Sequence, residues 1–188
     1  SALAATVQAG PQVLLTWRDN AVTEPGFIVE RSAGGGAFAE IGTVPAFAGS
    51  GPGVSFLHTL LGQPLDITYS YRVKALNAGG SSSYSNQINI FVPSVPLAPS
   101  NLLASAFLQG NNARVTLTWT DNAFNESAYR VWRSTDPNFA TGVTIVNLGA
   151  NATSYTTGNI ARGTLWYFRV TALNVSGFGS AETSVTTP

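Results

Sequence analysis

Two pairs of acidic residues are the side chains in this sequence whose spacing could support catalysis. Asp19 precedes Glu24 and Asp121 precedes Glu126, each by five positions. Paired carboxyl groups are the apparatus of glycoside hydrolysis, in which one acts as an acid and the other as a base or nucleophile. Carboxylate oxygens also bind calcium, although the acidic loop of about twelve residues found in strong sites is absent. These two kinds of chemistry compete with a purely structural role.

His58 is the single histidine of the chain, which has no cysteine. A Ser-His-Asp hydrolase would have to use this histidine, but no G-x-S-x-G turn presents a nucleophile to it. One histidine without any cysteine also argues against a zinc or copper site. We therefore expect a chain that is not an enzyme and that binds no cofactor and no metal.

The acidic pairs belong to a longer segment that occurs twice, and each matched pair of residues is 102 positions apart, as from Trp17 to Trp119. The matched pairs are Trp17 and Trp119, Asp19 and Asp121, Glu24 and Glu126, Val29 and Val131, and Arg31 and Arg133. One fold is therefore present twice. A catalytic pair would not be expected at the same place in both copies. An aspartate that fixes a loop and a glutamate that pairs with a strand arginine would be.

Short alternating segments predict strands along the whole chain, with turn residues between them and no helical period. In the first copy the sequence predicts a long loop over 46–53 and a last strand over 84–92. In the second copy it predicts strands over 101–107, 113–119, 128–134, 143–148, 153–156, 165–173 and 181–186. About seven short strands in each copy indicate an all-β chain of two tandem immunoglobulin-like antiparallel β-sandwiches.

The boundary between the two predicted domains, 1–93 and 94–188, falls in a segment with three prolines, Pro93, Pro96 and Pro99. Proline fixes φ and lacks an N–H donor, so the connection should be short and stiff. Inward-facing positions of the predicted strands should form the two cores. These positions are Trp17, Phe27, Val29, Tyr69 and Tyr71 in the first domain, and Trp119, Tyr129, Val131, Trp166 and Phe168 in the second.

The repeated Trp, the Asp-Asn with its following Glu, and the segments 26–32 and 69–77 resemble fibronectin type III domains, in the variety found in bacterial secreted and surface proteins. The resemblance covers essentially the whole chain. It implies a modular, non-catalytic domain and no particular ligand, because this fold carries many functions. It also implies that the Tyr69 hydroxyl ties a corner of the fold to the backbone. Trp166 takes the place of Tyr69 in the second copy, where an indole N–H could donate instead.

Charged residues make up 10% of the chain, in a balanced set of nine basic and nine acidic side chains. Soluble domains usually contain about 25%. Nucleic-acid-binding proteins gather Lys and Arg on one face, so we expect no nucleic-acid partner. No apolar run reaches the roughly 18 to 20 residues that span a bilayer, so we expect no membrane insertion. A surface rich in Ser, Thr, Asn and Gly favours an extracellular location, either secreted or at the cell surface.

Four outward positions of the second copy form the candidate binding face: Arg130, Trp132, Tyr167 and Arg169. Alternation places Trp132 and Tyr167 on the outside of one sheet, whereas the first copy has polar residues at these positions. An exposed aromatic pair flanked by arginines could bind a polysaccharide or a protein ligand. Alternatively, the arginines cover Trp132 by cation–π contact, or Trp132 packs on a loop or a neighbouring domain.

The sequence favours a spacer or presentation module whose partners are neighbouring domains of a longer parent chain. The alternative is a carbohydrate- or protein-binding module that uses the face around Trp132 and Tyr167. Self-assembly through exposed edge strands is a variant of the spacer hypothesis.

Overall fold

The computed structural model describes residues 2–46 and 50–188 of the chain. Within these residues all regular secondary structure is β-strand, and the chain divides into two compact units, Ser1–Ser94 and Val95–Pro188. None of the described residues forms a helix of the length and apolarity needed to cross a membrane.

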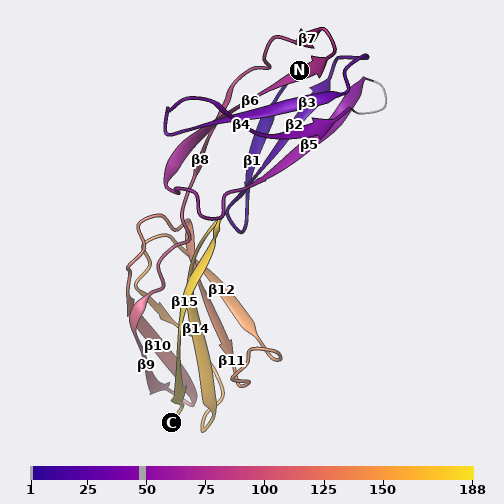
Figure 1. The fold of residues 1–188 in the computed structure, drawn as a ribbon. Helices are drawn as coiled ribbons and strands as arrows, with labels where there is room; N and C mark the ends of the chain where they lie inside the picture. Colours follow the sequence, from indigo (N-terminus) through magenta and orange to yellow (C-terminus); the bar gives the residue numbers. More distant parts are fainter. Residues whose placement is uncertain (1, 47–49) are drawn as a thin grey trace. The chain divides into compact units, whose positions relative to one another are not determined.

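The first unit is a sandwich of two antiparallel sheets (Figure 1). One sheet has the order β1-β2-β5, and the other has the order β4-β3-β6, with β7 and β8 both paired to β6. The strands are β1 Ala4–Gln8, β2 Gln12–Asp19, β3 Gly26–Ala33, β4 Ala39–Pro45, β5 Gly51–Thr59, β6 Ile67–Asn77, β7 Gly80–Ser81 and β8 Ile88–Val92.

The second unit repeats this arrangement with sheets of order β13-β10-β9 and β12-β11-β14-β15. Its strands are β9 Ser100–Gln109, β10 Asn112–Thr120, β11 Ala128–Ser134, β12 Thr144–Gly149, β13 Ser154–Thr156, β14 Leu165–Asn174 and β15 Gly177–Thr186. The predicted all-β fold of antiparallel sandwiches is therefore confirmed.

Both cores follow from strict alternation along the central strands. In β10, Val115 and Leu117 are fully buried, whereas Thr118 between Leu117 and Trp119 is exposed. Nine of the ten predicted core residues are buried: Trp17, Phe27, Val29, Tyr69, Tyr71, Trp119, Tyr129, Val131 and Phe168. The tenth, Trp166, is only half-buried and packs against the edge of its core.

The half-buried position of Trp166 follows from its place at a corner of the second unit. In the first unit the Tyr69 hydroxyl donates to the carbonyl of Pro64 at 2.6 Å. The Trp166 indole N–H donates to the carbonyl of Ala161, also five residues earlier, at a longer 3.5 Å. The hydroxyl of Thr187 donates to the same Ala161 carbonyl at 2.8 Å. Thr187 thus supplies the short corner bond that the tyrosine supplies in the first unit.

The last strand of the first unit differs from its predicted range, because β8 begins at Ile88 and residues 84–87 are not in a strand. The Ser82 and Ser85 hydroxyls accept the N–H groups of Ala75 and Val73, each at 3.0 Å. Side chains here replace the backbone acceptors of a regular ladder. In the second unit β15 pairs with β14 along its whole length.

The long loop predicted over 46–53 is also shorter than expected, because β5 already begins at Gly51. Residues 47–49 of that prediction lie outside the described residues. Proline and glycine at positions 52 and 53 misled the prediction, and a register shift between Trp17 and Arg18 lets this part of β5 continue along β2.

Candidate functional site

The two repeated aspartates fix loops, as the sequence predicted. Asp19 accepts the N–H of Ala21 through Oδ1 at 2.9 Å, and Asp121 accepts the N–H of Ala123 at 3.0 Å. A short acidic side chain that bonds the backbone two residues later forms a local turn at the end of its strand. This backbone bond holds each carboxylate at the end of β2 or β10.

A tyrosine in the second unit engages the aspartate further. The Tyr129 hydroxyl donates to Asp121 Oδ1 at 2.6 Å, and burial together with this bond raises the pKa of Tyr129. The first unit has Phe27 at the corresponding position, so Asp19 lacks that donor. Asp19 is fully buried, and its Oδ2 has no hydrogen-bond partner among the residues that the structure describes.

The repeated glutamates do not pair with strand arginines, which corrects the prediction. Glu126 accepts the backbone N–H of Asn151 at 2.9 Å and so ties two loops of the second unit together. The ion pairs of the described residues involve Glu30 and Glu182 instead of Glu24 or Glu126. The printed bonds of Asp19, Asp121 and Glu126 therefore hold loops in place.

His58 lies on β5 with its Nδ1 2.9 Å from the hydroxyl of Tyr71, a fully buried residue. Burial, helped by the positive charge of Arg31, lowers the pKa of His58 to about 4. The ring is therefore neutral near pH 7 and bonded to a core residue. In the second unit Thr157 takes this place and its hydroxyl accepts the N–H of Val115. The contacts of His58 are thus those of a residue that supports the core.

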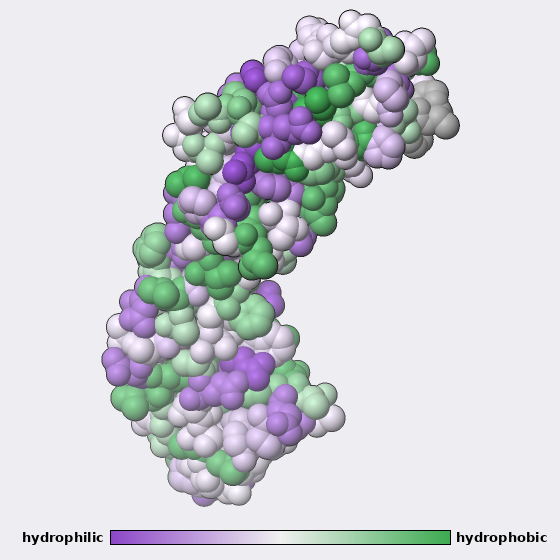
Figure 2. All heavy atoms as spheres, viewed as in Figure 1, coloured by the Kyte–Doolittle hydropathy of each residue, from purple (hydrophilic) through white to green (hydrophobic). Residues whose placement is uncertain are grey.

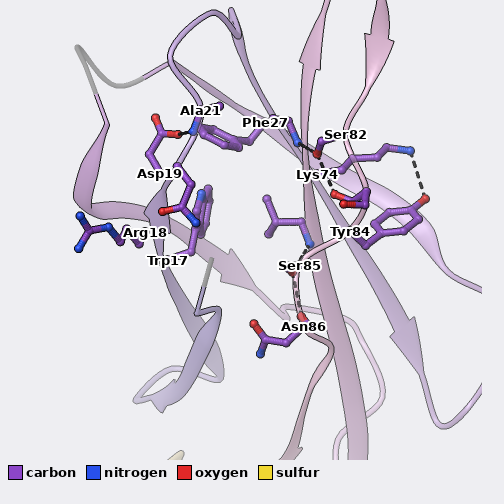
Figure 3. Close-up of a pocket in the computed structure, with 14 residues that line it drawn as sticks. Trp17, Arg18, Asp19, Ala21, Phe27, Lys74, Ser82, Tyr84, Ser85 and Asn86 are labelled. Atoms are coloured by element: carbon purple, nitrogen blue, oxygen red, sulfur yellow. Dashed lines mark hydrogen bonds between the residues drawn. The ribbon is translucent and has the colours of Figure 1, made fainter.

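A hollow of 340 Å³ lies at the side of the first unit where the last strand is interrupted (Figure 3). Trp17, Asp19 and Phe27 form one wall, and the residues from Ser82 to Asn86 form the opposite wall. In this second wall Ser82, Ser85 and Asn86 bond the backbone, and the Tyr84 hydroxyl bonds the side chains of Lys74 and Glu30. No histidine is among the described residues that line the hollow. Among the described residues, no three histidine or acidic side chains lie close enough to hold a metal ion together.

The outward face of β3 and β6 holds a compact charged cluster around Glu30. Glu30 accepts bonds from Arg72 at 2.8 Å and from Tyr84 at 3.0 Å, and its carboxylate lies 3.1 Å from Lys74 Nζ. Burial opposes the charged form of Glu30, but bonds from Arg72, Lys74 and Tyr84 outweigh it and lower the pKa of Glu30. Hydrophilic residues accordingly gather over these strands in Figure 2.

Although it lies on an outward face with polar residues, this cluster is largely buried. Only 9% of Glu30 is exposed. The guanidinium of Arg72 lies between two rings, 4.0 Å from the centroid of Phe38 and 3.7 Å from that of Tyr84. These aromatic side chains come from loops, so strand alternation could not reveal them. The available signal in the sequence was an aromatic residue in a loop that could reach a charged position on a strand.

The candidate binding face of the second unit is brought together on β11 and β14. Trp132 lies directly opposite Arg169, and Tyr167 lies opposite Ser134, two positions further along the same face. All four predicted residues, Arg130, Trp132, Tyr167 and Arg169, are partly buried. Trp132 is thus less exposed than expected, and its indole N–H is buried without a hydrogen-bond partner among the described residues.

Within residues 2–46 and 50–188, no cation–π contact joins the arginines of this face to Trp132, although such a contact was one of the alternative predictions. Arg130 donates to Asn147 at 3.0 Å. Arg169 pairs with Glu182 at 2.6 Å and stacks 4.4 Å from the ring centroid of Phe139. Phe139 therefore repeats the stack that Phe38 makes in the first unit. Binding of a polysaccharide or a protein by this face stays a prediction.

Comparison with known proteins identifies the fold. No protein-family profile and no curated protein sequence matches the chain. Among solved structures, the FN1–FN3 domains of chicken CNTN1 match with a TM-score of 0.68 and 16% identity, over 99% of this chain and 64% of that one. A segment of two fibronectin type III domains from chicken tenascin matches with a TM-score of 0.44 and 15% identity, over 100% of this chain and 98% of that one. The likeness to the CNTN1 domains shows a fibronectin type III fold.

Proposed function

We propose that this chain is a non-catalytic spacer of a larger secreted or cell-surface protein. In this role two sandwiches in tandem set the distance between the parts of the protein on either side of them. The fold supports the modular part of the proposal, because the matching structures are themselves segments of several fibronectin type III domains. The sparse charge of the chain, 10% of residues, supports an extracellular setting.

The observation that carries the proposal is the anchoring of the connecting segment. The N–H of Ser94 donates to Asp66 Oδ1 at 2.9 Å, within the first unit. The carbonyl of Ala98 accepts from Asn122 Nδ2 at 2.9 Å, within the second unit. Each part of the segment is thus bonded to its own sandwich, which leaves few rotatable residues between the bonds.

Gly179 on β15 allows the backbone of the connecting segment to pack closely against this strand. A Cβ at position 179 would lie 2.6 Å from the backbone oxygen of Pro96 and 2.6 Å from the nitrogen of Ala98. The connecting segment therefore lies directly on the strand at a place that only glycine permits. The prolines of the segment add restriction of φ. A connection of this kind suits a module that keeps the parts on either side of it at a fixed distance.

The test is a distance distribution between the two units, measured by pulsed electron spin resonance. Spin labels are attached to cysteines introduced at Val22 and Leu103, which are 77% and 67% exposed. The chain has no cysteine of its own, so labelling is specific. We expect one narrow distribution. A broad distribution in the unaltered chain would contradict the spacer function.

A matched pair of variants tests the anchoring itself. Gly179→Ala should broaden the distribution, because the added methyl group displaces the segment from β15. Gly158→Ala is the control, because a Cβ there meets nothing within 4 Å. If Gly179→Ala leaves the distribution as narrow as the control does, then the packing on β15 does not stiffen the connection.

A further inference from the structure

The strand β12 is an edge strand without the features that usually prevent edge strands from pairing. Its six residues, TIVNLG, include no charge and no proline, and its register with β11 runs without a bulge. Native edges are commonly blunted by charged residues, proline or bulges. A flat edge of β-branched and apolar residues favours pairing with another strand.

The corresponding strand of the first unit, β4, carries all of these protections. It contains Glu40 and Pro45, and its pairing with β3 shifts register between Val29 and Glu30. Glu40 lies opposite Glu30, whereas Ile145 lies opposite Trp132 at the matching place in the second unit. The two copies therefore differ at one edge, where a charged residue corresponds to an isoleucine that is 46% exposed.

The outer edge of β12 is open within its own unit. The strand pairs with β11 along its whole length, and no backbone hydrogen bond among the described residues joins its other edge to a second strand. In an antiparallel strand every second residue directs its N–H and C=O away from the neighbour. Unpaired groups of this kind form a template for an added strand.

The other edges of the described chain are short, covered or protected. β13 has three residues and β7 has two. β1 and β8 run alongside each other, as do β9 and β15. β5 contains Pro52 and a register shift, and β4 is protected as above. None of these other edge strands matches β12 in length, flatness and lack of charge. The strand that does match it is β12 of a second copy.

We propose that two copies of this chain associate by antiparallel pairing of their β12 strands about a twofold axis. A twofold axis perpendicular to the sheet keeps each residue on its own face, so the axis passes between one residue and its own copy, at Val146 or Asn147. The pairing joins two sheets of four strands into one continuous sheet. It places Ile145 beside the partner strand, so that its exposed side chain is covered. No charged residue on β12 opposes the approach.

Sedimentation of the full chain over a range of concentrations tests the pairing. The weight-average mass should rise from 19.6 kDa towards twice that value. Ile145→Glu places the acidic residue of β4 on β12 and should weaken association by about tenfold or more, because a charged side chain then lies at the edge that has to pair. Leu103→Glu is the control, because it removes an apolar side chain that is 67% exposed on β9. It should leave association unchanged.

Cross-linking locates the contact independently of that substitution. Val146→Cys or Asn147→Cys places the only cysteine of the variant beside its own copy at the axis, so mild oxidation of the variant at the axis position should give a covalent dimer through the paired strands. Leu103→Cys should give no more dimer than random collision. The proposal would be overturned by a constant mass up to about 1 mM, or by a loss of association in Leu103→Glu equal to that in Ile145→Glu. It would also be overturned if the cysteine variant on β12 and Leu103→Cys cross-linked equally.

Discussion

Trp132 lies directly opposite Arg169 across β11 and β14, at the place where Glu30 lies opposite Arg72 across β3 and β6. The two arginines keep the same stack on a phenylalanine, but their carboxylate partners differ. Arg72 forms an ion pair with Glu30 on β3, the strand on one side of β6. Arg169 forms its ion pair with Glu182 on β15, which lies on the other side of β14 from β11. The first unit thus has a glutamate, Glu30, where the second unit has Trp132. In the second unit the carboxylate of the ion pair lies two strands away from that position.

The Glu30 cluster should contribute measurably to stability. Glu30→Gln removes the charge that Arg72 and Lys74 share in a largely buried position, so we expect the first unit to lose about 1 to 3 kcal/mol of unfolding free energy. Glu182→Gln is the control, because half of that side chain is exposed and surface pairs contribute about 0 to 1 kcal/mol. Urea unfolding measures both. Equal losses would show that burial of Glu30 adds nothing.

The two central tryptophans should be equally important to their own units. Trp17→Ala and Trp119→Ala each remove a side chain that is at least 95% buried, so each should cost about 3 to 5 kcal/mol through lost burial and the cavity left behind. Urea unfolding followed by circular dichroism checks this for each variant, because Trp17 is the only tryptophan of the first unit. A loss below about 1 kcal/mol in either variant would contradict the packing of that core.

Acid should destabilise the first unit through His58. Its folded pKa of about 4 lies below its ordinary value of 6.5, so the unfolded chain binds more protons between these values. Stability is present above pH 6.5 and is lost as the pH falls towards 4. After allowance for partial exposure, the loss should be about 1 to 2 kcal/mol. His58→Gln should flatten this part of the pH profile of thermal unfolding, and an unchanged slope would assign it to other groups.

Tyr129 and Phe27 provide a reciprocal pair of substitutions. Tyr129→Phe removes the 2.6 Å bond to Asp121 and should destabilise the second unit by about 1 to 2 kcal/mol. Phe27→Tyr adds a hydroxyl beside Asp19, whose Oδ2 lacks a partner in the described part of the chain, and should stabilise the first unit by up to about 1 kcal/mol. Calorimetry of the full chain measures both. Destabilisation by Phe27→Tyr would show that the ring cannot reach the carboxylate.

Alternation was sufficient to predict the strands and nearly all of the core, because one face of each sheet packs against the other sheet. The range of β11 was predicted without error, and that of β10 to within one residue at each end. The interrupted last strand of the first unit was not predictable, because it depends on Ser82 and Ser85 reaching across to β6. The loop aromatics Phe38 and Phe139 were missed for the same reason: the contact exists only after folding brings a loop over a sheet.

The corner bond made by Thr187 has a consequence for a chain that carries tension. Thr187 bonds Ala161 and Thr164 through its hydroxyl, and its N–H donates to the Thr164 carbonyl at 3.0 Å. A force applied through the segment after β15 reaches these bonds before it reaches the paired strands. In the first unit the corner hydroxyl comes from Tyr69 on β6, and the segment that leaves the domain is bonded to the nearby Asp66 through the N–H of Ser94. Pulling should therefore open the corner of the second unit first, and the resistance of that unit should begin at a single threonine.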